Sequence, residues 1–283
     1  MEHSFSPTKP SLLKVEPDPS TWQARLAADQ ETVFSRLLEL CDLQGAAVLE
    51  IGGLLPESLV AAAGVAVWWA VDPRNPAGEG SGLVRPLRGR ASALPLPAGS
   101  IDCVFSSNAF QHVHDLPATL EEVARVLRPG GVLYANFGPV WSAPDGSHVE
   151  ALVWEGKRYD FWEQTLLPSW AHLVGDEAEL ASALAPLHGA SLAGAIAGYV
   201  HRSDWINRLF FDDYARIFAA SPLQVVGLGG CPGFDYEYRP PVIGPPLSER
   251  LLPERLPAEV QARHGRDKKN LDVRDIEVLL RLA

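Results

Sequence analysis

Sulfur-containing residues are scarce in this chain of 283 residues, which has three cysteines and one methionine. Cys41, Cys103 and Cys231 are odd in number, lie far apart and form no Cys-x-x-Cys pair. This spacing favours neither a disulfide framework nor a structural zinc site of the kind that paired cysteines build. We interpret the three cysteines as buried free thiols.

An excess of positive charge is also missing, because 24 lysines and arginines stand against 35 aspartates and glutamates, a formal net charge of -11. Unspecific affinity for nucleic-acid phosphates needs a basic surface. A local basic cluster does not reverse this balance; it consists of Arg263, Arg266, Lys268 and Lys269. The charge therefore argues against nucleic acid as a partner.

The sequence has no long hydrophobic run. The longest, from Val60 to Val71, is too short to span a bilayer and contains Gly64. No N-terminal stretch combines a basic start with an apolar core. We therefore expect a cytoplasmic protein with no membrane partner or anchor.

Short apolar runs alternate with helical patterns, which predicts a parallel sheet whose strands are buried on both faces. The expected central strands are Ala46 to Ile51, Ala66 to Val71, Ile101 to Ser106 and Val132 to Phe137, and the expected late strands are Leu223 to Leu228 and Ile276 to Leu280. The expected helices run from Trp22 to Cys41, from Pro56 onward, and from about Ala118 to Leu127. With right-handed crossovers these elements make an α/β fold with an open, doubly wound sheet.

Two regions stand outside this alternation. Residues 1–20 carry four prolines and little periodicity, so we expect a flexible or draped N-terminal arm ahead of one domain over residues 21–283. Residues from about 138 to 203 break the strand pattern but are rich in tryptophan, which predicts an ordered insertion that forms a lid over the sheet. Helices are expected in or next to it at Glu177 to Leu187 and, after a cap at Ser203 or Asp204, from Trp205 through Ala220 with a break near Asp212.

Ligands of an open α/β sheet bind beyond the carboxyl ends of its strands, so the residues that follow each strand are the candidate site. They include Glu50, Gly52 and Gly53 after the first strand, Asp72 after the second, Ser106, Asn108 and His112 after the third, and His148 after the fourth. The two glycines allow a ligand to approach the backbone closely. Asp72 follows about twenty residues later and can accept both hydroxyl protons of a ribose.

Two histidines are the candidate catalytic residues, with His148 ahead of His112. An imidazole suits a general base that takes a proton from a substrate hydroxyl. The alternative for His148 is a turn residue paired with Asp145 or with solvent, and the alternative for His112 is the start of a surface helix. The spacing of His112, His114 and Asp115 does not match a two-metal hydrolase pattern, so no metal is expected.

Several of these segments resemble the class I S-adenosylmethionine-dependent methyltransferases, and more narrowly their small-molecule branch known as methyltransferase type 11. The resemblance covers residues 46–137 closely, and its last two blocks are the most specific. Its segments are Val48-Leu49-Glu50-Ile51-Gly52-Gly53, Val71-Asp72-Pro73, residues 94–106, Phe110-Gln111-His112-Val113 and residues 121–133.

The resemblance implies a Rossmann-like sheet of seven strands, S-adenosylmethionine as the cofactor and S-adenosylhomocysteine as its product. It also implies a small-molecule acceptor, such as a hydroxylated natural product or a sugar derivative. In this family Glu50 and Gly52 would face the methionine part of the cofactor, and Asp72 would hold its ribose. The backbone after Ser106, near Asn108, would contact the amino group and the adenosine.

Three residues differ from the family pattern. Leu54 and Pro56 stand at the second and third glycine positions of the cofactor loop, and Arg90 stands where an acid usually contacts the adenine amine. These differences leave a second interpretation open, because one fold hosts many activities. In it, the protein has the methyltransferase fold but acts as an isomerase, a cyclase or a non-catalytic binding protein, with little or no cofactor binding. The oligomeric state is open as well.

Overall fold

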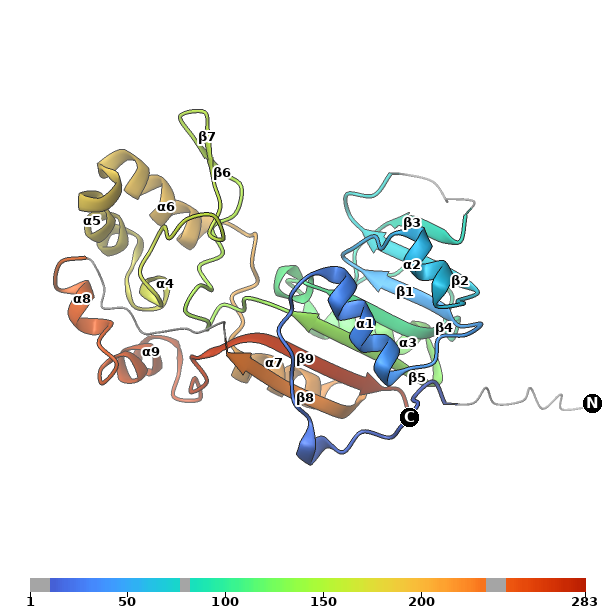
Figure 1. Cartoon of the computed structure of the whole chain (residues 1–283). Coiled ribbons are helices and arrows are strands. Elements are labelled where there is room, and N and C mark those ends of the chain that lie inside the picture. Colours follow the sequence, from blue (N-terminus) through green and yellow to red (C-terminus); the bar gives the residue numbers. More distant parts are fainter. Residues whose placement is uncertain (1–10, 77–81, 233–242) are drawn as a thin grey trace, which may run out of the picture.

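A sheet of seven strands forms the centre of the structure, a computed structural model that describes residues 11–76, 82–232 and 243–283 (Figure 1). Its strand order is β3-β2-β1-β4-β5-β9-β8, and β9 runs antiparallel to both of its neighbours. The strands are β1 (Ala47–Ile51), β2 (Val67–Asp72), β3 (Val84–Arg88), β4 (Ile101–Ser107), β5 (Leu127–Phe137), β8 (Gln224–Pro232) and β9 (Val273–Arg281). The predicted Rossmann-like α/β fold is confirmed, including both late strands.

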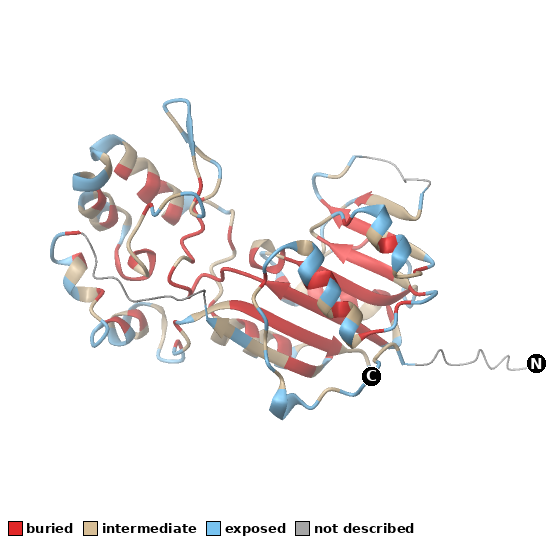
Figure 2. Cartoon of the chain, viewed as in Figure 1, coloured by how far each residue is buried: buried red, intermediate tan, exposed pale blue. Residues whose placement is uncertain are grey.

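Helices cover both faces of this sheet. On one face, α1 (Gln30–Leu40) and α2 (Glu57–Ala62) bury Phe34, Leu37 and Val60 against the strands. On the other face, α3 (Leu116–Val126) and α7 (Phe211–Ala220) contribute to a second apolar cluster. Figure 2 shows the central strands as buried between these layers, and every residue of β4 is buried. This burial on both faces explains why the strands read as continuous apolar runs.

The chain crosses from one half of the sheet to the other between β1 and β4. It runs outward from β1 through β2 to β3, and then adds β4 and β5 on the other side of β1. The carboxyl ends of β1 and β4 are therefore the topological switch point, where ligands of such sheets bind. The segments that follow these two strands thus belong to the candidate site.

A helical lobe lies beyond the carboxyl ends of the parallel strands (Figure 1). It contains the hairpin of β6 (Leu152–Trp154) and β7 (Lys157–Tyr159), and the helices α4 (Ala171–Val174), α5 (Glu177–His188), α6 (Ala190–Arg202), α8 (Leu247–Arg250) and α9 (Leu256–His264). Its apolar core draws on residues between Trp141 and Phe210 and between Ile243 and Leu271. The predicted insertion at 138–203 thus shares its core with a later part of the chain. Its action as a lid stays a prediction.

The predicted helix from Trp22 is wrong in its first half. α1 begins only at Gln30, where the Asp29 side chain caps it by accepting a hydrogen bond from the Thr32 amide. The segment before it is held against the sheet instead, since the Arg25 amide donates to Glu277 Oε2 at 2.7 Å. Apolar spacing alone could not reveal this, because a chain that crosses a sheet also buries alternate side chains.

The helical prediction after the insertion also needs correction. Residues 205–210 are not helical, and α7 begins at Phe211, close to the expected break. The short helix η2 (Phe110–His112), the helix α6 and the strand β3 had no counterpart in the prediction. β3 contains Pro86 and two arginines, so it lacks the apolar run that marks the other strands.

The predicted N-terminal arm lies partly outside the described residues, which begin at position 11. A short 3-10 helix, η1 (Pro19–Thr21), falls at its end, and Leu13 forms a β-bridge with Cys41. Cys41 and Cys103 are buried free thiols as expected, but Cys231 is only half-buried. Among helices within 11–76, 82–232 and 243–283, none has the length and apolar character that crossing a bilayer requires.

Candidate functional site

Glu50 lies one residue before the end of β1 and is fully buried. Its Oε2 accepts hydrogen bonds from the Trp68 indole at 2.6 Å and from the Leu55 amide at 3.0 Å, and its Oε1 accepts one from the Gln30 side chain. Burial raises the pKa of this carboxyl, and the three donors oppose that shift. Glu50 therefore ties the loop after β1 to β2 and to the start of α1, and its predicted contact with a cofactor remains a prediction.

The two glycines after β1 are packed tightly against the chain itself. Gly52 has a φ of 80°, a left-handed conformation that favours glycine, and its amide donates to the Val71 carbonyl at 3.0 Å. A side chain at Gly52 would overlap the Cβ of Ala109, and one at Gly53 would overlap the Glu50 carboxylate. Gly52 thus requires glycine, and a side chain at Gly53 would displace the ends of Glu50 and Gln30. Both positions bring bare backbone to the switch point.

Asp72 ends β2 and is engaged by a neighbour two residues along the chain. Arg74 donates from Nε to Oδ1 and from Nη2 to Oδ2, both at 3.0 Å, and its amide donates to Oδ1 at 2.7 Å. These bonds lower the pKa of Asp72, which stays ionised at neutral pH. The Arg74 side chain is 76% exposed. It can therefore leave Asp72 at little cost when another donor arrives.

Ser106 and Asn108 stabilise the end of β4. The Ser106 hydroxyl donates to the Ile51 carbonyl at 2.9 Å and so joins the ends of β4 and β1. Asn108 has a φ of 49°, and its side-chain amide donates to the Ala28 carbonyl at 3.0 Å. Both predicted cofactor residues thus lie at the switch point, where their side chains position backbone segments around it.

The two candidate catalytic histidines lie together, although 36 positions separate them in the sequence. The rings of His112 and His148 meet edge to face with centroids 5.0 Å apart. His148 has a φ of 48° and is 3% exposed, so its backbone and its ring are both firmly placed. Its side chain pairs with Glu150, with 3.5 Å between Nε2 and Oε2, while its backbone amide donates to the Asp145 carbonyl at 3.4 Å, as in a turn.

Two residues that sequence reasoning did not single out for this site complete the histidine pair. Trp205 uses its backbone carbonyl to accept a hydrogen bond from His112 Nδ1 at 2.6 Å, and its indole donates to Glu150 Oε2 at 2.7 Å. Glu150 is two positions after His148, a spacing that puts both side chains on one side of an extended segment. In the sequence, only that spacing could have indicated a role for Glu150, and it is a weak signal.

Electrostatics connect this cluster to the sheet edge. Burial lowers the pKa of His112 to about 4, and the neighbouring His148 adds to the shift, so His112 is neutral at neutral pH. The pKa of Glu150 is lowered first by its contact with His148. The pKa of Arg74 is raised by Asp72 and also by the charge of Glu150. Sheet and lobe thus present their ionisable groups to a common region.

The remaining residues noted in the sequence lie apart from this cluster. Leu54 is 53% exposed, so its side chain leaves the core, and Pro56 stands at the cap of α2. Arg90 is exposed beside a β-bridge to Ala93. His114 donates from Nε2 to the Asp204 carbonyl oxygen at 2.6 Å.

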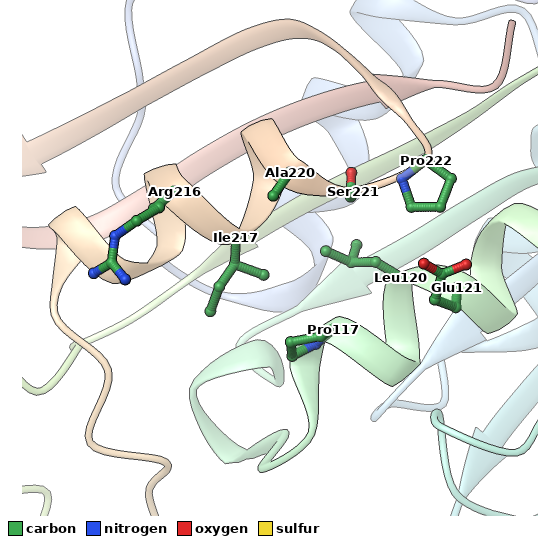
Figure 3. Close-up of a pocket in the computed structure, with 8 residues that line it drawn as sticks. All are labelled: Pro117, Leu120, Glu121, Arg216, Ile217, Ala220, Ser221 and Pro222. Carbon is green, nitrogen blue, oxygen red and sulfur yellow. The ribbon is translucent and has the colours of Figure 1, made fainter.

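A separate small pocket of about 180 Å³ lies between α3 and α7 (Figure 3). Pro117, Leu120 and Glu121 line it from α3, and Ile217 and Ala220 line it from α7. None of the predicted site residues contributes to it. It lies on the face of the sheet that α3 and α7 cover and not at the strand ends, so we do not count it as part of the candidate site.

Comparison with known proteins finds similarity to methyltransferases over part of the chain. Residues 62–135 match the model of the methyltransferase domain family of type 11. The chain is 42% identical over 89 residues to a malonyl-[acyl-carrier protein] O-methyltransferase of Methylococcus capsulatus, which covers 28% of this chain and 31% of that protein. It is 33% identical over 151 residues to an uncharacterized methyltransferase of Mycobacterium ulcerans, covering 48% of this chain and 57% of the relative.

A solved structure is similar in fold. An S-adenosylmethionine-dependent methyltransferase from Mesorhizobium loti superposes with a TM-score of 0.46 at 14% identity, covering 87% of this chain and 95% of that one. The matched part of this chain spans between about a third and just over half of the length of the two curated relatives above. Residues 62–135 include β2, β4, α3 and most of β5, so this part of the sheet is similar to a methyltransferase domain.

Proposed function

We propose that this protein transfers a methyl group from S-adenosylmethionine to a small hydroxylated acceptor, such as a natural product or a sugar derivative, in the cytoplasm. The observation that carries the proposal is the meeting of His112 and His148 beside the sheet edge at which this family binds its cofactor. The cofactor would lie at the ends of β1, β2 and β4. The acceptor would lie between that edge and the helical lobe.

The residues at the sheet edge fit the cofactor in two respects. Asp72 is ionised and can accept two hydroxyl protons from a ribose once the exposed Arg74 side chain moves away. The backbone at Gly52 and Gly53 carries no side chain that would keep a ligand at a distance. When bound, S-adenosylmethionine supplies an electrophilic methyl group on its sulfonium. The protein's task is then to align the acceptor oxygen with that methyl and to exclude water.

The histidine cluster supplies the acceptor side of the proposed reaction. His148 is the candidate base that takes the proton from the acceptor hydroxyl, and Glu150 stabilises the imidazolium that results. The Trp205 carbonyl accepts a hydrogen bond from His112 Nδ1–H and so orients the ring. Nε2 of His112 remains as an acceptor. His112 is thus a second group that can bind the acceptor hydroxyl.

Two contacts favour the alternative, in which a protein of this fold does not methylate. Arg74 donates hydrogen bonds to both carboxylate oxygens of Asp72, and Glu50 already accepts three hydrogen bonds from groups of the protein itself. If these contacts persist in the presence of S-adenosylmethionine, the protein is an isomerase, a cyclase or a binding protein on a methyltransferase fold. The two interpretations differ in whether cofactor is consumed.

A turnover assay separates them. The full chain is incubated with S-adenosylmethionine and a panel of phenolic, sugar and carboxylic acceptors, and release of S-adenosylhomocysteine is measured. The proposal expects acceptor-dependent release that falls at least about tenfold in His148→Gln, while His114→Gln, at an exposed neighbouring histidine, keeps wild-type turnover. Product formation from an acceptor without any S-adenosylhomocysteine would support the alternative.

A further inference from the structure

The cluster of His112, His148 and Glu150 has a property that methyl transfer does not require. Each residue offers one ligand atom, and the three atoms all lie within 4.8 Å of one another. Two imidazole nitrogens and one carboxylate oxygen form the ligand set that zinc and other first-row transition metals prefer. We infer that this cluster binds a divalent transition-metal ion, with Zn²⁺ as the ion that it suits best.

The separations are close to those of a formed site. Metal bonds of about 2.0–2.1 Å place the ligand atoms of a tetrahedral zinc site about 3.4 Å apart. His148 Nε2 and Glu150 Oε2 are already 3.5 Å apart. The ligand atom of His112 lies within 4.8 Å of those of His148 and Glu150, at most about 1.4 Å more than the separation in a formed site.

Trp205 orients two of the three ligands from outside the cluster. Its carbonyl binds His112 Nδ1 at 2.6 Å, which fixes the tautomer that carries the lone pair on Nε2. Its indole binds Glu150 Oε2 at 2.7 Å and so holds the carboxylate. Histidine and carboxylate ligands of metal sites are held by outer hydrogen bonds of this kind. One residue therefore prepares both ligands.

The state of His148 is an independent observation. Its side chain is 4% exposed, and no group in the described parts of the chain is hydrogen-bonded to its buried Nδ1. A buried polar atom without a partner carries a free-energy cost, so its retention calls for an explanation. A metal ion coordinated at Nδ1 would give this buried atom a partner.

The surrounding charges permit a cation. The Trp205 carbonyl accepts the Nδ1 proton of His112, so the lone pair of Nε2 faces away from that bond. Glu150 supplies one negative charge. Arg74 is the cation whose charge acts on both His112 and Glu150, and Asp72 neutralises it through a two-point ion pair.

Three protein ligands leave at least one coordination position open, as in catalytic zinc sites. Water or an acceptor hydroxyl can take that position, and the ion lowers the pKa of a bound hydroxyl, which makes its oxygen a better nucleophile. This consequence rests on the proposed function. The ion would then take over the activation of the acceptor, and His148 would act as a ligand in place of a base.

The site can be tested without any turnover. Purified full-length protein is stripped with a chelator and titrated with Zn²⁺ by calorimetry, in parallel with His112→Gln, Glu150→Gln and Trp205→Phe. His114→Gln is the matched control, because this neighbouring histidine is exposed and its ring bonds to the Asp204 carbonyl, a bond that a glutamine amide can also donate. Thermal unfolding of each variant reports whether it is folded.

We expect one Zn²⁺ per chain in the wild type and in His114→Gln. The two ligand variants should bind at least about a hundredfold more weakly, and Trp205→Phe, which loses only the outer bond to Glu150, about tenfold more weakly. Unchanged affinity in both ligand variants, or no binding by the wild type, overturns the inference. If a ligand variant does not fold, the visible spectrum of the Co²⁺-loaded wild type decides. Bands of four- or five-coordinate Co²⁺ support the site, and the spectrum of hydrated Co²⁺ overturns it.

Binding of S-adenosylhomocysteine is measured on the same samples, so the two proposals can fail separately. Zn²⁺ binding without S-adenosylhomocysteine binding leaves the metal site standing and contradicts the proposed function. The reverse result leaves the proposed function standing, with His148 as its base, and contradicts the metal site.

Discussion

Arg74 holds Asp72 through two parallel hydrogen bonds, from Nε to Oδ1 and from Nη2 to Oδ2, each 3.0 Å long. The pair lies at the end of β2, where the proposed function places the ribose of the cofactor, so the guanidinium and the ribose would compete for the same oxygens. The Arg74 side chain is mostly exposed to solvent, which keeps the contribution of this ion pair to stability small.

This competition predicts opposite effects for the two partners. Asp72→Ala should weaken S-adenosylhomocysteine binding at least about tenfold, because hydrogen bonds to a charged group contribute about 1.5–3 kcal/mol. Arg74→Ala should leave the affinity unchanged or raise it by a factor of about two to five, because it frees Asp72. Calorimetry measures both. Equal losses in the two variants would mean that Arg74 itself binds the cofactor.

The glycine after β1 predicts a stability difference. Gly52→Ala places a Cβ against Ala109 and also forces alanine into a left-handed backbone, whereas Gly45→Ala has a similar φ of 70° but nothing within 4 Å of the new Cβ. The control should lose about 1–2 kcal/mol of unfolding free energy from the backbone alone. Gly52→Ala should lose about 1–3 kcal/mol more, from overpacking. Urea unfolding of both variants checks this, and equal losses would show that Ala109 yields to the new methyl.

A buried histidine in the lobe predicts a pH dependence of stability. His172 donates from Nε2 to the Trp141 carbonyl, and burial lowers its pKa to about 3, whereas the unfolded chain titrates near 6.5. Its contribution to stability is therefore complete above pH 6.5 and is lost as the pH falls from 6.5 toward 3.

Between pH 7.5 and pH 5 this group should account for a loss of about 2 kcal/mol, at about 1.4 kcal/mol per pH unit below 6.5. His172→Gln keeps a donor for Trp141 but does not titrate, so its stability should fall less over that interval. His114→Gln should follow the wild type. Denaturant unfolding at both pH values measures the difference, and parallel curves for wild type and His172→Gln would exclude His172 as the source.

Arg90 predicts a change in adenine recognition. A guanidinium has only donors, while the adenine amine needs an acceptor, and the Arg90 side chain is exposed. Arg90→Asp should therefore tighten S-adenosylhomocysteine binding by up to about tenfold, the value of one added hydrogen bond. Arg266→Asp, the same charge change on an exposed arginine after α9, should have no effect. Weaker binding in Arg90→Asp alone would indicate that the arginine stacks on the adenine.

The sheet could be predicted from the sequence because its strands are buried on both faces. Each such strand reads as an apolar run that ends at a glycine, a proline or a polar residue, as at Gly52 and Asp72. β3 was not predicted because Pro86 and the two arginines of this strand interrupt the apolar run. The start of α1 was misplaced because Trp22 and Leu26 match a helical spacing while the backbone around Arg25 bonds to the sheet.

The residues of the site were predictable one at a time, but their arrangement was not. The positions of Asp72 and Asn108 follow from strand ends, which every parallel sheet brings to one edge. The contact between His112 and His148, and the bracing of both His112 and Glu150 by Trp205, depend on how the lobe packs onto that edge. No local pattern in the sequence encodes that packing, so Glu150 and Trp205 were missed.

The proposed function requires that this chain binds S-adenosylmethionine at the ends of β1, β2 and β4. The direct test is calorimetric titration of the full chain with S-adenosylhomocysteine, repeated on Asp72→Ala. The account predicts one binding site with a dissociation constant of about 1–100 μM, which corresponds to about 5–8 kcal/mol, and a clear loss in the variant. The absence of binding up to about 1 mM ligand, or full affinity in a folded Asp72→Ala protein, would contradict it.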